Sequence, residues 1–317
     1  MDIPREQRGP SAWVGAELAD DPSWIWELSE PEVDQLVSRR FGPELSGRAE
    51  RLRLELLRGR GFELIRGLPV DRLTVEEAGD VFTAFGLLLG NPRSQNAAGD
   101  LLDHVRNIGA DVTDPNVRIY QTDHRQTFHT DSTDVVGLLC LRTAASGGES
   151  MLVSAATIYN RMLGEAPELA ALLFEPVATD RRGEVPPGQK PFFTIPVLNW
   201  YDDVLTVLYQ RQYIESAERF DDAPPLTERK REALDLFDRI ANDPSVHLQM
   251  TLRPGDMQFV HNHSLLHDRT GFVDRPGDPR HLLRLWLSVP GDRRLPPVFA
   301  QRYGSIEVGD RGGIVVS

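Results

Sequence analysis

The spacing of apolar and polar residues divides the chain into a helical beginning and a strand-rich remainder. Residues 46–60 are rich in Leu, Arg and Glu and end at Gly61, which predicts a helix. Residues 62–65 then alternate like a short strand before a Gly-Leu-Pro turn. A second helix is expected to run to about residue 89 and stop at Gly90, because Thr74 and Glu77 have the spacing of a capping box. We therefore expect residues 1–90 to be largely helical.

From about residue 128 onward, short apolar runs are separated by turn-forming residues. Helices are expected at 154–163 and from about Thr227, where apolar residues share one face. The Pro- and Gly-rich stretches 183–191, 221–226 and 271–279 are expected to be loops and are candidate lids. The pattern predicts a mainly β core with flanking helices rather than alternating βαβ units. The candidate strands are 135–141, 150–153, 204–209, 247–252, 256–260 and 282–288.

Composition narrows the possible functions. The 317 residues are 40% hydrophobic and 26% charged, which is typical of a globular protein. A net charge of −13 disfavours binding to nucleic acid or to an anionic membrane, so an anionic ligand requires a local arginine cluster. Cys140, the one cysteine, lies in an apolar run and is expected to be a small core residue. With no apolar signal segment and no run of membrane-spanning length, we expect a cytoplasmic protein.

Common nucleotide-binding and nucleophile motifs are absent from the sequence: it contains no GxGxxG, P-loop, CxxC or GxSxG. One candidate for chemistry is the triplet His129-Thr130-Asp131. On an extended segment, residues i and i+2 point to the same side, so an imidazole and a carboxylate can aim at one point. Taken alone the triplet is weak, because a surface loop in which His and Asp only hydrogen-bond gives the same pattern.

A histidine-rich segment at residues 255–269 is expected to be a strand carrying three histidines, and it is a candidate source of a further metal ligand. It contains His261, His263 and His267, which share sequence parity, so spacing alone does not choose among them. Two His and one carboxylate form the facial triad of non-haem Fe(II) oxygenases. Zinc hydrolases use similar ligands, so both chemistries stay open at this point.

Two arginines in the apolar run that follows bear on this choice. Arg280 and Arg284 are four residues apart, which places them on one face of a strand. A buried guanidinium is costly without a partner, and its planar fork suits a carboxylate. The partner is expected to be an anionic ligand, or else an Asp or Glu from another strand.

Four separated motifs together resemble the taurine dioxygenase (TauD/TfdA) family. They are HTD at 129–131, GGES at 147–150, GDMQFVHNHSLLHDRTGF at 255–272 and RHLLRLWL at 280–287. The resemblance covers roughly residues 120–290. It implies a double-stranded β-helix (jelly-roll, cupin-like) core there, within a single domain spanning residues 1–317. It also implies Fe(II) as cofactor, with 2-oxoglutarate and O₂ as cosubstrates.

The resemblance also assigns roles to individual residues. His129, Asp131 and His267 match the iron ligands, with His267 preferred because it fills the family's LHxR position. Arg280 matches the arginine that clamps 2-oxoglutarate, and Ser150 matches the hydroxyl that helps it, where the family more often has Thr. Because halogenases of the wider superfamily lack the carboxylate, Asp131 favours hydroxylation, or hydroxylation followed by breakdown or desaturation.

The substrate is expected to be a small, anionic molecule. Arg284 fits a position that meets the acidic group in sulfonate-using members, unless it forms a salt bridge behind the cofactor. Further candidates are Arg125, Asn96 and His104, while Tyr120, Tyr209 and Arg211 are weaker ones. The alternatives are a metal-dependent hydrolase with the same His/Asp/His site, and a binding protein that kept the fold. A homo-oligomer would be unsurprising, as dimers or tetramers would be for relatives.

Overall fold

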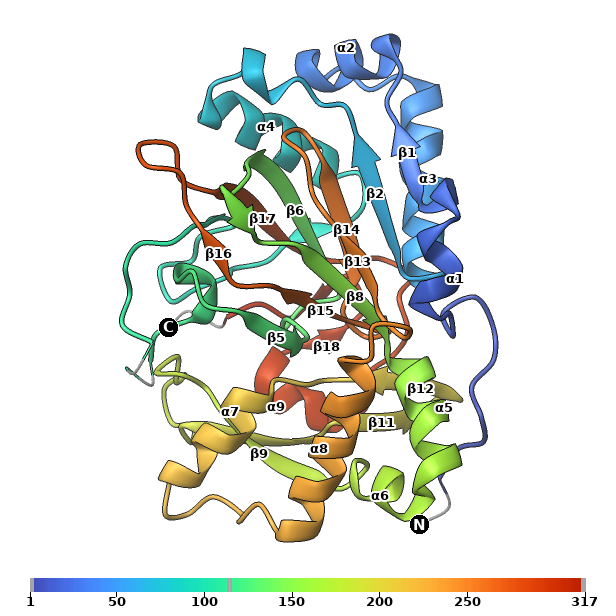
Figure 1. Ribbon diagram of the computed structural model, residues 1–317, viewed down its shortest axis with the longest axis vertical. Coiled ribbons are helices and arrows are strands. Elements are labelled where there is room, and N and C mark those ends of the chain that lie inside the picture. Colours follow the sequence, from blue (N-terminus) through green and yellow to red (C-terminus); the bar gives the residue numbers. More distant parts are fainter. Residues whose placement is uncertain (1–2, 113, 115, 315–317) are drawn as a thin grey trace.

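The computed structural model describes residues 3–112, 114 and 116–314, and a large mixed sheet runs through its centre (Figure 1). The strand β1 pairs with β2 in parallel, and the other pairings in this sheet are antiparallel. In spatial order the strands are β1 (Ile25–Glu27), β2 (Phe62–Arg66), β14 (Met257–His261), β6 (Val135–Arg142), β17 (His281–Ser288) and β3 (Asn91–Pro92), with β4 (Leu102–Val105) also beside β17.

A second, antiparallel sheet faces the first. Its order is β13 (Leu248–Met250), β8 (Ser150–Ser154), β15 (Leu265–Arg269) and β5 (Gln126–His129). Side chains from both sheets form one apolar cluster between them, including Phe62, Val136, Leu152 and Trp286. Two sheets packed face to face in this way form the double-stranded β-helix that the sequence predicts.

Alternation along β17 explains how one strand serves two layers. Leu283, Leu285 and Leu287 pack into a cluster with the N-terminal helices, whereas Leu282 and Trp286 pack between the sheets. Arg284 has the parity of the second set and therefore points between the sheets. The N-terminal helices are α1 (Gly15–Ala19), α2 (Glu30–Ser38), α3 (Pro43–Arg58) and α4 (Val75–Gly86).

The outer face of the smaller sheet is covered by α5 (Ala155–Glu165), α6 (Pro167–Leu172) and α8 (Glu228–Ala241), which share an apolar cluster with it (Figure 1). Between and after these helices the chain forms β9 (Pro176–Asp180), β10 (Phe192–Pro196), β11 (Leu198–Tyr201), β12 (Val204–Val207), α7 (Arg211–Ser216) and α9 (Ala300–Tyr303). Short two-residue strands are β7 (Ser146–Gly147), β16 (Phe272–Val273), β18 (Ile306–Glu307) and β19 (Asp310–Arg311). Single 3-10 turns occur at Pro22–Trp24, Val70–Arg72, Ile119–Gln121, Ala217–Arg219 and Pro297–Phe299.

Most predicted elements are confirmed. Thr74 and Glu77 form the expected capping box of α4, and the Thr227 side chain caps α8. The first ninety residues contain more β structure than expected, because β1, which was not predicted, pairs with the predicted strand β2 in the large sheet. Strands β9 and β10 lie in a region where none was predicted. Cys140 is buried between the sheets, as expected.

The histidine-rich segment differs most from its prediction. His261 ends β14 and His267 lies in β15, with residues 262–264 turning between them, so the three histidines do not share one strand. Because β14 belongs to the large sheet and β15 to the small one, the parity shared by the histidines does not put them on one face.

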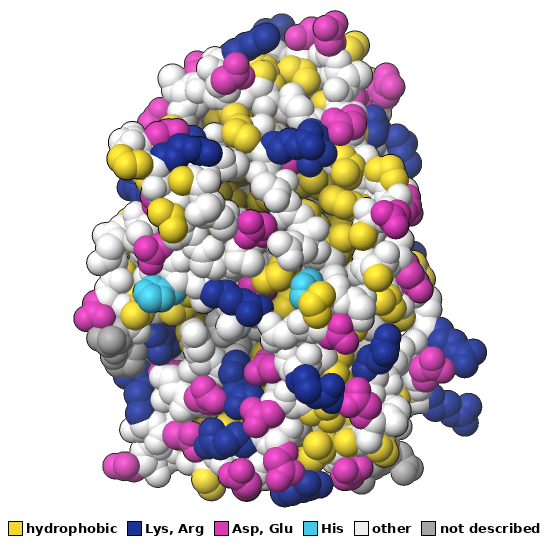
Figure 2. Space-filling view, viewed as in Figure 1, with side chains coloured by type: hydrophobic (Ala, Val, Ile, Leu, Met, Phe, Trp, Pro, Cys, Tyr) yellow, Lys and Arg dark blue, Asp and Glu magenta, His cyan; other side chains and the backbone are white. Residues whose placement is uncertain are grey.

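Among the described residues, no helix is both long and apolar enough to cross a membrane. On the face shown in Figure 2, acidic and basic side chains are interspersed.

Candidate active site

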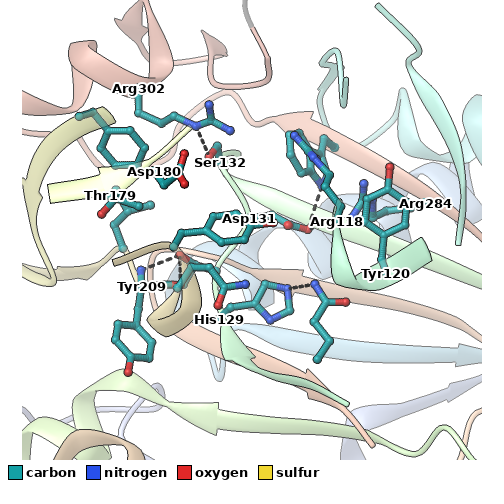
Figure 3. A pocket seen from close by; sticks show the side chains of 17 residues that line it. Arg118, Tyr120, His129, Asp131, Ser132, Thr179, Asp180, Tyr209, Arg284 and Arg302 are labelled. Carbon is teal, nitrogen blue, oxygen red and sulfur yellow. Dashed lines mark hydrogen bonds and ion pairs between the residues drawn. The ribbon is translucent and has the colours of Figure 1, made fainter. Parts of the chain in front are cut away.

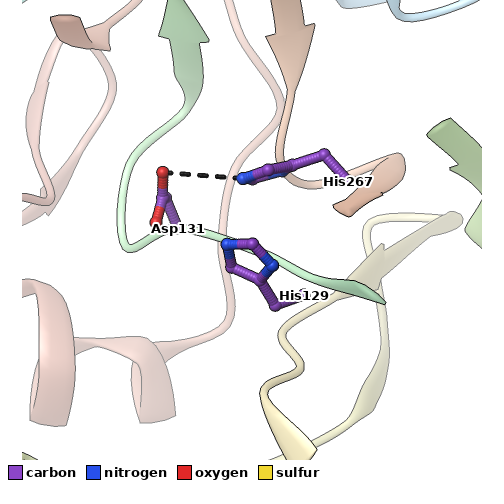
Figure 4. A group of neighbouring side chains, drawn as sticks. All are labelled: His129, Asp131 and His267. Carbon is purple, nitrogen blue, oxygen red and sulfur yellow. Dashed lines mark ion pairs between the residues drawn. The ribbon is translucent and has the colours of Figure 1, made fainter. Parts of the chain in front are cut away.

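The structure brings His129, Asp131 and His267 together, and we call this group the metal cluster (Figure 4). His129 ends β5 directly opposite His267 of β15, with ring centroids 4.1 Å apart. Asp131 follows two residues after His129, and its Oδ2 lies 3.7 Å from His267 Nε2. One donor atom from each residue lies within 4.8 Å of the other two. The three side chains can therefore meet one metal ion from one side.

Hydrogen bonds and burial prepare these groups to act as ligands. His129 Nδ1 lies 2.8 Å from the carbonyl oxygen of Thr127, to which it donates, so Nε2 carries the lone pair. The Gln126 side-chain amide donates to this Nε2 over 2.8 Å, and a bound metal would take the place of that donor. Burial lowers the pKa of His129, and it lowers that of His267 to about 3. Burial alone would raise the pKa of Asp131, but Arg284 and the two imidazoles outweigh it and lower that pKa. Two neutral imidazoles and one carboxylate are the donor set that fits Fe(II).

Asp131 is held in place by residues from two segments of the chain. The Trp286 indole donates from Nε1 to Asp131 Oδ2 over 2.9 Å. The Asp131 backbone N–H donates to Asn262 Oδ1 over 3.0 Å, from the turn between β14 and β15. These supports fix the carboxylate before any metal binds.

A cavity extends from the metal cluster between the two sheets and contains about 510 Å³ of empty space, part of which is open to solvent. At one side of it lies Arg280, which is 5% exposed and makes no ion pair with any described carboxylate. Its Nη1 is buried without a hydrogen-bond partner in the described chain, and burial lowers its pKa to about 10. A buried guanidinium with free donors fits the far carboxylate of 2-oxoglutarate. The cavity is lined by Val105, Tyr120, Gln126, His129, Asp131, Val136, Leu138, Ser150, Leu252, His267, Asp268, Arg269, Arg280, Leu282 and Arg284.

Ser150 and the preceding glycines complete this end of the cavity. The Ser150 hydroxyl lies in the lining and donates to Gln258 Oε1 over 3.0 Å. Gly148 has a φ of +77°, and a Cβ there would lie 3.1 Å from Arg280 Nε. The GGES motif therefore allows the backbone to pass close to the guanidinium.

The sequence interpretation did not single out Arg269, which also lines this cavity. Its guanidinium donates to the backbone carbonyls of Thr122 and His124 and has no carboxylate partner among the described residues. Burial, followed by the nearby Arg280, lowers its pKa to about 9. Its place in the LHxR motif was the available signal.

A second cavity with about 610 Å³ of empty space, partly open to solvent, also reaches Asp131 (Figure 3). It shares Tyr120, Gln126, His129, Asp131 and Arg284 with the first cavity, so both reach the metal cluster. Its remaining lining residues are Arg118, Thr130, Ser132, Thr179, Asp180, Phe193, Leu208, Tyr209, Gln210, Tyr213, Trp286 and Arg302. Those from β9, β10, α7 and α9 were not predicted, because the chain brings them in from distant positions.

Arg284 lies between the two cavities and is largely neutralised. Its Nε donates to Gln95 Oε1 over 2.7 Å and its Nη2 to Asp103 Oδ2 over 3.1 Å. Its guanidinium carbon lies 4.3 Å from the centre of the Tyr120 ring. The alternative of a carboxylate from another strand therefore holds for Arg284, through Asp103 of β4, and not for Arg280.

The structure does not bring three predicted substrate-binding residues to either cavity. Arg125 pairs with Asp268 at 2.6 Å, Asn96 bonds within its own loop to Asp100, and His104 is exposed and contacts His281. Each side chain is engaged by a partner outside the metal cluster, and for Arg125 and His104 that partner is far away in sequence, so proximity to the motifs did not reveal it. Of the weaker candidates, Tyr120 and Tyr209 line the second cavity. Arg211 does not, because it pairs with Glu215, Asp235 and Asp238.

His263 belongs to a different group, which we call the arginine cluster: Asp134, His263, Asp292 and Arg311. His263 Nε2 lies 2.9 Å from Asp134 Oδ1. His261 contacts the edge of this cluster, with Nε2 3.1 Å from Asp292 Oδ1. Neither histidine faces the metal cluster, which leaves His267 as the one of the three that does.

Comparison with known proteins gives evidence on the family of this chain that is independent of the geometry of the site. The chain is 34% identical to FR-33289 synthase of Streptomyces rubellomurinus over 313 residues, covering 91% of this chain and 92% of that protein. It is 29% identical to taurine hydroxylase-like protein SAT17 of Stachybotrys chartarum, covering 88% and 81%. The fold is similar to that of the non-heme iron oxygenase OrfP, crystallised with Fe and alpha-ketoglutaric acid, with a TM-score of 0.63, 18% identity and coverage of 83% and 93%.

A family model matches most of the sequence. The model for "Taurine catabolism dioxygenase TauD, TfdA family" covers residues 36–286, which includes the metal cluster and Arg280. None of these comparisons supports the hydrolase alternative. The chain therefore belongs to the taurine catabolism dioxygenase TauD, TfdA family and is a non-haem iron, 2-oxoglutarate-dependent dioxygenase.

Proposed function

We propose that His129, Asp131 and His267 bind Fe(II), that Arg280 and Ser150 bind 2-oxoglutarate, and that a small anionic substrate is hydroxylated in the second cavity. The observation that carries this proposal is the Arg280 guanidinium. It is buried, without a carboxylate partner among the described residues, in a cavity that leads to the metal cluster. Such a group needs an anion, and a dicarboxylate that also reaches the metal supplies one.

The two cavities support separate sites for the two organic molecules, with 2-oxoglutarate in the first cavity and the substrate in the second. Bound iron would supply the centre at which O₂ and 2-oxoglutarate react, giving succinate, CO₂ and one oxygen atom for the substrate. The chain contributes position: Arg280 orients the cosubstrate, and Leu138, Leu252 and Leu282 keep water from its carbon chain. Trp286 holds Asp131 from the side of the second cavity, where a substrate would lie.

The names of similar proteins support a small substrate with an acidic group. Taurine, for which the fungal relative is named, carries a sulfonate. The OrfP structures include one with (3S)-hydroxy-L-Arg, an amino acid. In this chain, three arginines line the second cavity, namely Arg118, Arg284 and Arg302. This lining suits a compact anion better than an uncharged or cationic molecule.

The test needs no substrate. Fe(II) and 2-oxoglutarate are added to the protein without oxygen, and the weak visible charge-transfer band of chelated iron is recorded. A saturable band is expected for the wild type and not for Arg280→Ala at the same 2-oxoglutarate concentration. Iron binding without any band in the wild type would contradict the proposal and favour other chemistry at the metal cluster.

A further inference from the structure

One wall of the second cavity contains two arginines that share one carboxylate. Arg118 begins the 3-10 turn at Ile119–Gln121, and Arg302 lies in α9. Arg118 Nη2 bonds to Glu184 Oε2, and Arg302 Nη2 lies 3.7 Å from that same oxygen. All three side chains are at least 87% buried. The group therefore carries one positive charge more than its internal partner neutralises.

Arg302 has donors that the described chain does not use. Its Nε donates to Ser132 Oγ over 2.8 Å, which fixes the guanidinium beside the cavity (Figure 3). Its separation from Glu184 is too long for a hydrogen bond, and no described residue accepts one from its Nη1 or Nη2. Burial, together with the nearby Arg118, lowers the pKa of Arg302. A charged fork that is largely buried and has no hydrogen-bond acceptor for its Nη atoms among the described residues is a ready site for an oxyanion.

The other charged groups of this cavity are already engaged. Asp180 lies 3.0 Å from Arg219 Nε and accepts a hydrogen bond from Ser216. Arg284 is bound to Gln95 and Asp103. Asp131 belongs to the metal cluster. An anion entering the cavity therefore finds its uncompensated positive partner at Arg302 and Arg118.

We propose that Arg302 and Arg118 bind the anionic group of the substrate, a carboxylate or a tetrahedral oxyanion such as a phosphonate. This inference rests on the proposed function and moves the anion site away from Arg284, the position expected from the family resemblance. Ser132, the hydroxyl partner of Arg302, directly follows Asp131 in the chain. The anion is thereby held close to the metal cluster, which selects the carbon presented for hydroxylation.

The test measures anion binding directly. The protein is loaded anaerobically with Fe(II) and 2-oxoglutarate and titrated by calorimetry with ethylphosphonate, with propionate and with the uncharged analogue 1-propanol. We expect saturable binding of at least one anion and none of the alcohol, and the two anion arms distinguish a tetrahedral group from a carboxylate. If neither anion binds saturably, the proposal is overturned.

Variants locate the site. Loss of a charge-assisted hydrogen bond predicts that Arg302→Gln weakens anion binding by roughly tenfold or more. Arg294→Gln is the matched control, because Arg294 is 70% exposed and pairs with Asp202. Glu184→Gln is expected to strengthen anion binding, since it removes the competing carboxylate, and misfolding cannot mimic this gain. Unchanged affinity in both Arg302→Gln and Glu184→Gln would overturn the assignment.

The same samples separate this inference from the proposed function. The charge-transfer band reports binding of iron and 2-oxoglutarate and is expected to be unchanged in Arg302→Gln. A missing band in the wild type contradicts the proposed function, whereas a normal band without anion binding contradicts only the arginine site.

Discussion

The protein has two buried groups of histidine and carboxylate side chains, and each contains one of two aspartates that are only three residues apart in the chain. The two groups differ in which side chains face their carboxylate oxygens. The metal cluster contains Asp131 and the arginine cluster contains Asp134. In both groups the candidate ligand atoms lie within 4.8 Å of one another. By residue type and spacing, either group could be a metal site.

The arginine cluster already has a cation of its own. The Arg311 guanidinium is fully buried, with Nε 2.7 Å from Asp134 Oδ1 and Nη2 2.9 Å from Asp292 Oδ2. In the metal cluster, the guanidinium of Arg284 stays 3.9 Å from Asp131 Oδ2, beyond hydrogen-bond distance. The two carboxylates of the arginine cluster therefore bind Arg311 and hold the C-terminal part of the chain in place. The carboxylate of the metal cluster has no described guanidinium within hydrogen-bond distance, so it remains available to a metal ion. Proximity of ligand types does not by itself identify a metal centre.

The largest effect is expected when one histidine is removed from each group, which tests which of the two groups binds the metal. His267→Ala is expected to abolish iron-dependent turnover of 2-oxoglutarate, because one of three proposed ligands is lost. His263→Ala is expected to keep measurable turnover and to lower stability instead. Succinate formation and thermal unfolding of both variants are the measurements. The reverse pattern would place the metal at the arginine cluster.

Removing Arg311 tests the structural role of the second group. Arg311→Leu leaves two buried carboxylates without their cation, which predicts a loss of about 3–5 kcal/mol in the free energy of unfolding. The exposed pair of Arg294 and Asp202 provides the control: Arg294→Leu is expected to cost about 1 kcal/mol or less. Denaturant unfolding followed by tryptophan fluorescence gives both values. Equal stability of the two variants would show that Arg311 does not hold the fold.

Substitution of Arg280 tests whether its guanidinium binds the cosubstrate 2-oxoglutarate beside the metal cluster. Arg280→Ala is expected to weaken 2-oxoglutarate binding by roughly ten- to a hundredfold, from the loss of charge-assisted hydrogen bonds. Arg280→Lys should recover part of the affinity, since it keeps the charge but not the fork. Arg142→Ala is a control on the neighbouring strand, because Arg142 is 39% exposed and pairs with Asp278. An unchanged affinity in Arg280→Ala would point to another clamp, with Arg269 and Arg284 the next to test.

The smallest expected effect is a pH dependence of stability from the arginine cluster. Burial lowers the pKa of His263 to about 4 from its ordinary 6.5. Because the unfolded chain then binds more protons, His263 contributes stability above pH 6.5 that is lost as pH falls toward 4. His263→Gln should therefore unfold with a shallower pH dependence over this window than the wild type. Identical slopes would mean that the protonation of His263 does not differ between the folded and unfolded states.

Local patterns were sufficient to identify the longer helices and several strands of the two sheets, but not β5 or β15, which carry His129 and His267. The capping box of α4, the Thr cap of α8 and the apolar runs of β6, β8 and β17 all depend on residues close together in sequence. Strands β9 and β10 escaped prediction because they pair mainly with each other beside the second cavity. The candidates Asn96, His104 and Arg125 were chosen for polarity near motifs, but Asn96 bonds within its own loop, and His104 and Arg125 bond to partners that are distant in sequence.

The sequence by itself determined the motifs: the His129/Asp131 pair, the later histidine and Arg280, together with the family that uses them. These signals are local, since each depends on residue type and short spacing. Only the tertiary structure decided which of three histidines faces Asp131, because the turn at residues 262–264 sends His261 and His263 toward Asp292 and Asp134. It also brought Arg118, Glu184 and Arg302 together from distant segments. Such long-range pairings depend on how the two sheets and their connections pack, which no short pattern encodes.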